Sequence, residues 1–88
     1  IAMGHNWILL KKGADAISFG QKVLASGGSA TNPLPKSLLG DVLAYTKLLG
    51  PGESESISFT APTIAGEYEY VCTFPGHFAM MRGSMEVK

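Results

Sequence analysis

Apolar residues fall into five short segments whose patterns are typical of β-strands: 7–10, 42–46, 56–60, 67–72 and 84–88. The first is continuously apolar, as in a buried strand. The third and fourth alternate between apolar and polar residues, as in strands with one face in solvent. In the fourth segment Tyr68, Tyr70 and Cys72 share one face, because successive side chains of a strand point to opposite sides.

One segment has helical spacing instead. Between Ala14 and Ser26, apolar side chains recur roughly as on one face of a short helix. Gly20 lowers the helix propensity there, and the two glycines after Ser26 predict the helix end. Turns that contain glycine and proline separate the segments. Short strands, such turns and one helical excursion together predict an all-β protein, a β-sandwich.

The length and charge of the chain narrow the possible functions. With 88 residues, we expect one small domain over residues 1–88. Basic and acidic residues number 7 each, so no basic excess favours nucleic acid or anionic lipid as a partner. No apolar run approaches the length of a membrane span. Charged residues make up 16% of the chain and hydrophobic residues 45%, which leaves room for an apolar contact surface.

Three side chains with metal-binding chemistry lie close together in the sequence: Cys72, His77 and Met81. Thiolate, imidazole and thioether donors together suit copper and let it change between Cu(I) and Cu(II). In the predicted strand order, Cys72 ends one strand, His77 lies in the connecting loop and Met81 leads into the next strand. A loop this short cannot enclose a metal alone, so we expect a further donor from His5, the only other histidine.

Each of these residues also has a simpler structural interpretation. A lone cysteine is most often a small buried hydrophobe, a histidine near Trp7 is typical of a core rim, and methionines commonly fill cores. The spacing Cys-x4-His-x3-Met with an upstream histidine favours a metal site, because blue-copper sites combine one Cys, two His and a weak axial Met. Asn6 is placed to tie the two ligand segments together by hydrogen bonds. Pro75 and Gly76 are placed to bend the loop back toward Cys72.

Two motifs resemble those of one known family. Met-Gly-His-Asn-Trp at 3–7 and Cys-Thr-Phe-Pro-Gly-His at 72–77 are similar to the motifs of azurins, the bacterial blue-copper proteins of the cupredoxin family. Residues 42–50 resemble the azurin strand that follows the helical flap, so the likeness runs from end to end of the chain. Auracyanins are the next most similar group, and Gly4 directly before His5 favours the azurins.

The resemblance implies a type 1 copper site with a defined ligand set. His5, Cys72 and His77 would bind copper in a trigonal plane. Met81 would be the weak axial ligand, opposite a long contact from the backbone carbonyl of Gly4. Such a site belongs to a one-electron carrier that performs no bond chemistry, so the resemblance implies a protein that is not an enzyme.

Supporting and docking residues are implied in the same way. The backbone N–H groups of Asn6 and Phe74 would hydrogen-bond the sulfur of Cys72. The electron would leave through His77 to redox proteins that dock briefly on an apolar collar around it. The collar consists of Met3, Phe74, Pro75, Gly76, Ala79 and Met80. The resemblance further implies a periplasmic or other extracytoplasmic location.

The family fold is a cupredoxin-like Greek-key β-sandwich with one short helical insertion, and residues 1–88 resemble its C-terminal two-thirds. Only four residues precede His5, so we expect the sandwich to be N-terminally incomplete. Open sheet edges favour pairing with another chain. Three explanations stay open: the sequence is a fragment, it has been trimmed, or it is one half of a two-chain assembly in which a second chain or a dimer partner supplies the missing strands.

Other functions are compatible with parts of the pattern. A fragment or scaffold would bind copper or zinc in the same cage without a redox role. A storage or delivery protein would have to release its metal, which a buried and rigid thiolate cage does slowly. The electron-transfer domain of a larger copper enzyme would carry a histidine beside the cysteine, whereas Val71 and Thr73 flank Cys72.

Overall fold

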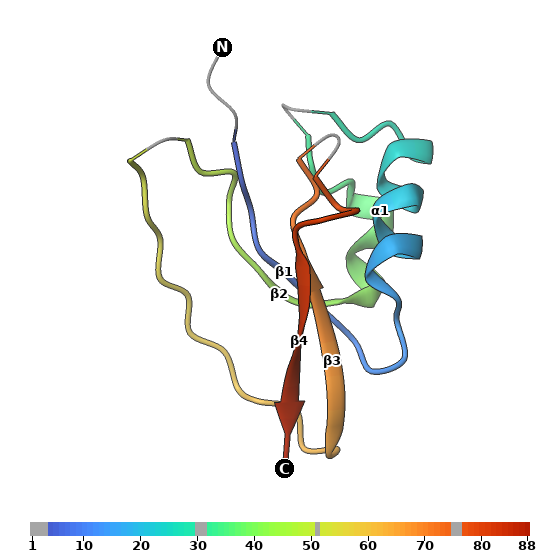
Figure 1. Cartoon of the computed structure of the whole chain (residues 1–88), viewed down its shortest axis with the longest axis vertical. Helices are drawn as coiled ribbons and strands as arrows, with labels where there is room; N and C mark the ends of the chain where they lie inside the picture. Colours follow the sequence, from blue (N-terminus) through green and yellow to red (C-terminus); the bar gives the residue numbers. More distant parts are fainter. Residues whose placement is uncertain (1–3, 30–31, 51, 75–76) are drawn as a thin grey trace.

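The computed structural model describes residues 4–29, 32–50, 52–74 and 77–88. Its elements are, in chain order, β1 (Ile8–Leu10), α1 (Ala16–Ala25), the 3₁₀ helix η1 (Lys36–Asp41), β2 (Val42–Tyr45), β3 (Gly66–Val71) and β4 (Arg82–Val87). The strands form one antiparallel sheet with the order β2-β1-β3-β4 (Figure 1). The predicted mainly-β fold with a helix between residues 14 and 26 is confirmed, and η1 is a second, short helix that the sequence pattern did not predict. Neither described helix is long and apolar enough to cross a lipid bilayer.

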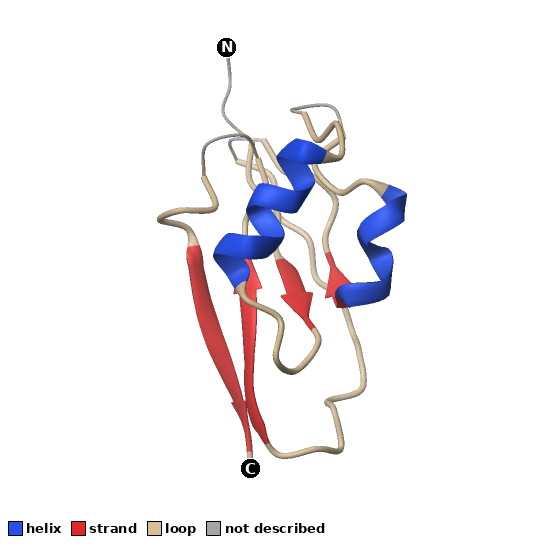
Figure 2. Ribbon diagram, turned by 90° about the vertical axis from the view of Figure 1, so that its right-hand side faces the viewer, coloured by secondary structure: helices blue, strands red, loops and turns tan. Residues whose placement is uncertain are grey.

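The helices and the sheet form two layers with the core between them. Both α1 and η1 lie on one side of the sheet, as the two perpendicular views show (Figures 1 and 2). From the sheet, Ile8, Leu10 and Val71 enter the core and are at most 1% exposed. From α1, Phe19 and Val23 pack against them. Burying a side chain of this size stabilises the fold by about 1.5–3 kcal/mol, so this contact holds α1 on the sheet.

Two carboxylates fix the start of α1. Asp15 is the N-cap, and its side chain accepts a hydrogen bond from the backbone N–H of Ser18 at 2.8 Å. This bond holds the pKa of Asp15 below its ordinary value. Glu69 of β3 accepts a second bond, from the backbone N–H of Ala16 at 2.7 Å. A strand side chain thus satisfies a donor that has no partner within the helix, and α1 is attached to β3 by polar as well as apolar contact.

One predicted strand is wrong. The segment 52–65 runs past the sheet on the side away from α1 (Figure 1), and 56–60 pairs with no other described strand. The alternation in 56–60 is still expressed in packing, because the ring centroid of Phe59 lies 6.0 Å from that of Trp7. Alternation indicates which side chains meet an apolar surface. A strand also needs a backbone partner, and the pattern within one segment carries no information about that partner.

Candidate metal centre

Three donor atoms converge at the end of the sheet where β1 begins and β3 ends. One ligand atom each from His5, Cys72 and His77 lie within 4.8 Å of one another. The Sγ of Cys72 is 3.7 Å from Nδ1 of His77, and the rings of His5 and His77 stack with centroids 4.9 Å apart. Metal–sulfur and metal–nitrogen distances of about 2.3 and 2.0 Å at a trigonal angle separate the two donors by about 3.7 Å. The spacing therefore fits binding of one first-row metal ion by both atoms.

Backbone hydrogen bonds close the loop that carries two of these residues. The N–H of Cys72, directly after β3, donates to the carbonyl of Met81 at 2.9 Å, across the base of the loop. Inside the loop, the N–H of His77 donates to the carbonyl of Phe74 at 2.9 Å, and the N–H of Met81 donates to the carbonyl of His77 at 2.8 Å. Met81 is 41% exposed, and binding of its sulfur to the metal stays a prediction.

His5 is held by a different part of the chain. Its backbone exchanges two hydrogen bonds with Leu49, of 2.9 and 2.7 Å. The preceding residue, Gly4, is buried, and a Cβ at this position would lie 2.9 Å from the side chain of Leu48. A larger residue would force Leu48 to shift. The predicted long contact from the Gly4 carbonyl to the metal stays a prediction.

A pair of side-chain hydrogen bonds joins the two ligand segments. Asn6 Nδ2 donates to Oγ1 of Thr73 at 2.9 Å, and the backbone N–H of Thr73 donates to Oδ1 of Asn6 at 2.7 Å. Thr73 Oγ1 in turn donates to the carbonyl of Pro33. The side chains of Asn6 and Thr73 are both buried. The sequence pattern does not single out Thr73; its position directly after Cys72 is the available signal. Donation from the N–H groups of Asn6 and Phe74 to the Cys72 sulfur stays a prediction.

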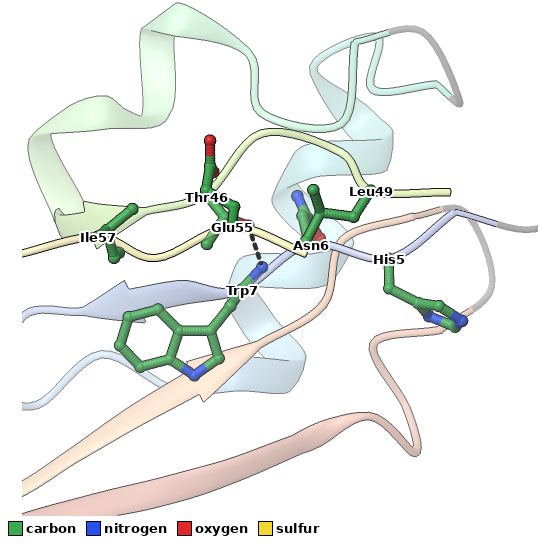
Figure 3. Close-up of a pocket in the computed structure, with 7 residues that line it drawn as sticks. All are labelled: His5, Asn6, Trp7, Thr46, Leu49, Glu55 and Ile57. Atoms are coloured by element: carbon green, nitrogen blue, oxygen red, sulfur yellow. Dashed lines mark hydrogen bonds between the residues drawn. The ribbon is translucent and has the colours of Figure 1, made fainter. Parts of the chain in front are cut away.

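The three donor residues differ in exposure. Cys72 is 4% exposed and His77 is half-buried, whereas His5 is exposed. His5 borders an open pocket of about 370 Å³, whose other described lining residues are Asn6, Trp7, Thr46, Leu49, Glu55 and Ile57 (Figure 3). The backbone N–H of Trp7 donates to Thr46 Oγ1 at 3.0 Å in its wall. In the described part of the chain, the thiol is thus shielded while the His5 side of the centre is open.

Part of the predicted docking collar is described. The ring of Phe74 lies beside that of His77, with centroids 4.9 Å apart. Ala79 is exposed and Met80 is 89% exposed, both in the turn after His77. The remaining predicted members, Met3, Pro75 and Gly76, lie outside the described residues. The described members therefore place exposed apolar surface next to His77.

Comparisons with known proteins agree with the chemistry of this centre. The family described as copper binding proteins of the plastocyanin/azurin family matches residues 1–88. Azurin of Achromobacter denitrificans is 43% identical, covering 99% of this chain and 58% of the relative. Azurin of Pseudomonas chlororaphis is 41% identical, covering 98% of the chain and 66% of the relative. The chain thus spans roughly three-fifths to two-thirds of the length of these relatives.

Solved structures give the same fold. Auracyanin A, a blue copper protein of Chloroflexus aurantiacus, superposes with a TM-score of 0.79 at 40% identity, covering 97% of this chain and 68% of that one. Reduced auracyanin of Roseiflexus castenholzii superposes with a TM-score of 0.76 at 37% identity, covering 100% and 69%. The predicted cupredoxin-like fold is confirmed. Azurins and auracyanins, the two groups that the sequence motifs resemble, thus both match this chain.

Proposed function

Because the chain belongs to the copper-binding plastocyanin/azurin family, we propose that it carries single electrons between redox partners by means of one type 1 copper, which supplies the Cu(II)/Cu(I) couple. Copper is the metal of the family, and one thiolate with two imidazoles is a donor set that suits it. The observation that carries the proposal is the convergence of these three donors from two distant segments. This function requires no substrate chemistry of the chain, so we propose that the protein is not an enzyme.

We assign the ligands as follows. His5, Cys72 and His77 would hold the copper, with Met81 and the backbone carbonyl of Gly4 as weaker ligands. The spacing between the Cys72 sulfur and the His77 nitrogen supports binding of one metal ion by these two residues. The bond from the N–H of Cys72 to the carbonyl of Met81 supports the assignment of Met81, because it keeps the two residues adjacent.

The protein's own contribution is to hold the donors still. The Asn6–Thr73 hydrogen bonds and the His5–Leu49 backbone pair join the ligand segments to each other and to neighbouring chain. Donors that keep their positions require little rearrangement when the charge on the metal changes. Burial of Cys72 limits water at the sulfur. Both effects favour repeated electron transfer over metal release.

Partner proteins are proposed to dock next to His77. Phe74, Ala79 and Met80 provide exposed or half-buried apolar surface there, and Met3, Pro75 and Gly76 are proposed to complete it. An apolar surface of this kind suits brief encounters between redox proteins. By family membership we further propose a periplasmic location. We also propose that residues 1–88 belong to one cupredoxin-like domain, because the described core is one cluster.

Copper loading tests the function directly. Titration with Cu(II) is expected to show one equivalent bound, an intense blue absorption band, and a reversible one-electron wave in voltammetry. Zinc should bind in the same cage without colour. Copper binding with neither the band nor the wave would favour a metal-binding scaffold. Reduction of a substrate that depends on this chain alone would favour a domain of a copper enzyme.

Replacement of Met81 by leucine is expected to keep the blue band and to raise the reduction potential. The thioether donates weakly to Cu(II), so its loss destabilises the oxidised form relative to the reduced form. A tenfold loss of relative Cu(II) affinity corresponds to about 59 mV, and we expect a shift of that order in voltammetry. Met80→Leu is the matched control, because Met80 is 89% exposed and should leave the potential unchanged. Loss of copper in Met81→Leu would make Met81 a primary ligand.

Removal of the His77 side chain tests the electron exit. In His77→Gly, the blue band should disappear and return in large part when free imidazole is added, because the ligand comes from the loop surface. His5→Gly is the necessary comparison, since His5 is the more exposed histidine in the described residues and borders a pocket. Restoration of the band by imidazole in His5→Gly alone would move the proposed exit to the His5 side.

A further inference from the structure

Phe78, the residue after the proposed ligand His77, packs against the protein core. Its side chain is half-buried and packs against the core cluster formed by β1, β3 and α1. The next two residues of the turn, Ala79 and Met80, are exposed. Among the described residues from 78 to 80, Phe78 is therefore the one whose side chain anchors the turn in the core.

The ring of Phe78 rests on the backbone of α1 at Gly20. A Cβ at position 20 would lie 2.2 Å from Cγ of Phe78 and 2.5 Å from its Cβ, closer than two such atoms can approach. Gly20 is buried and lies inside the helix, where glycine is less favourable than alanine. Its φ is not positive, so the backbone conformation does not require glycine. The absent side chain is explained by the space that Phe78 occupies.

This contact links His77 to the part of the protein that holds Cys72. The helix α1 is attached to β3 by the bond from Ala16 N–H to Glu69 and by core packing, and Cys72 follows β3 directly. Inside the loop, His77 is positioned by backbone bonds to its close neighbours. The contact between Phe78 and α1 supplements these backbone bonds, because it connects the loop to a separate rigid element.

We propose that Phe78 and the notch at Gly20 position His77 relative to Cys72, so that Phe78 is a positioning residue of the metal centre. The proposal rests on the function proposed above. If Phe78 had a purely structural role, its removal would lower the stability of the protein without changing the metal site. Positioning residues outside the ligand set typically change metal affinity about 10–100-fold when removed. The two roles therefore predict different measurements.

The experiment compares Phe78→Ala and Gly20→Ala with Phe19→Ala. Phe19 lies in the same core cluster and is 2% exposed, so its loss is a matched loss of core volume that changes neither a residue of the turn nor the space at Gly20. We expect Phe78→Ala and Gly20→Ala each to weaken Cu(II) binding at least about tenfold and to change the position or intensity of the blue band. Phe19→Ala should lower the unfolding temperature while the copper spectrum stays that of the wild type. Phe78→Leu, which keeps an apolar knob, should recover most of the affinity.

A double-mutant cycle and the metal-free protein complete the test. If the two residues act through one contact, Gly20→Ala should have little further effect on copper affinity once Phe78 is alanine. In metal-free protein, NMR contacts between the rings of His5 and His77 should weaken in Phe78→Ala and persist in Phe19→Ala. A wild type without a blue band would contradict the proposed function, and the NMR result would still decide this inference. Unchanged affinity, spectrum and ring contacts in both Phe78→Ala and Gly20→Ala would overturn it.

Discussion

Replacing Cys72 by serine is expected to abolish the intense blue absorption of the copper-loaded protein and its reversible one-electron wave. The band requires charge transfer from a thiolate to Cu(II), and serine offers a hard hydroxyl in place of soft sulfur. Loss of a residue that only supports a ligand typically lowers metal affinity by about 10–100-fold. Because Cys72 is itself a proposed ligand, Cu(II) affinity should fall by more than that. Because the two side chains have similar size and Cys72 is 4% exposed, the fold should be retained. Visible absorption and voltammetry measure the effect.

The control for this substitution is Thr73→Ser. It changes the neighbouring residue but keeps the hydroxyl that accepts from Asn6 and donates to Pro33. This variant should remain blue, with a potential close to that of the wild type. A blue band that survives in Cys72→Ser would mean that the sulfur of Cys72 is not a ligand, and the assignment of the centre would have to be abandoned.

Replacing Asn6 by alanine is expected to lower the stability of the protein while it leaves every proposed ligand in place. The change removes both hydrogen bonds between Asn6 and Thr73 and leaves the buried N–H of Thr73 without its acceptor. A buried polar group without a partner costs about 1–3 kcal/mol, and we expect the free energy of unfolding to fall by that amount. Urea denaturation of the metal-free protein measures it.

The effect of Asn6→Ala should extend to the metal centre. Asn6 joins the His5 segment to the Cys72 segment, so its loss should also weaken copper binding and broaden the blue band. Gln21→Ala, an exposed position on α1, is the control and should change neither stability nor colour. Should Asn6→Ala match Gln21→Ala in both measurements, the hydrogen-bonded link would have no role in holding the ligands.

Most elements could be predicted from sequence, because their patterns of apolar residues match the faces that are buried in the structure. The run 7–10 is apolar throughout, and in β1 both faces are buried: Ile8 and Leu10 pack beneath α1, and Leu9 is also 0% exposed. The helix could be predicted for the same reason, because its apolar face packs on the sheet. The strand predicted at 56–60 shows the limit. Its alternation is real, but its backbone partner is a property of the assembled sheet.

The candidate metal donors could be recognised by type and spacing, whereas the residues that position them could not. Soft and borderline donors at Cys72, His77 and His5 are rare enough in this chain to be recognised together. Thr73 carries no such chemical mark, and its role depends on Asn6, far away in the sequence. Gly20 lowers the predicted helix propensity, and only the packed structure explains its presence, through Phe78.

The sequence by itself determined the donor chemistry, the presence of a mainly-β fold with one helix, and the family, because these depend on residue identity and local spacing. The tertiary structure decided the rest. It brought His5 to within 4.8 Å of the loop donors, paired Asn6 with Thr73, and placed Phe78 on Gly20. Each of these contacts joins segments that are distant along the chain, and such contacts are set by the packing of the whole core.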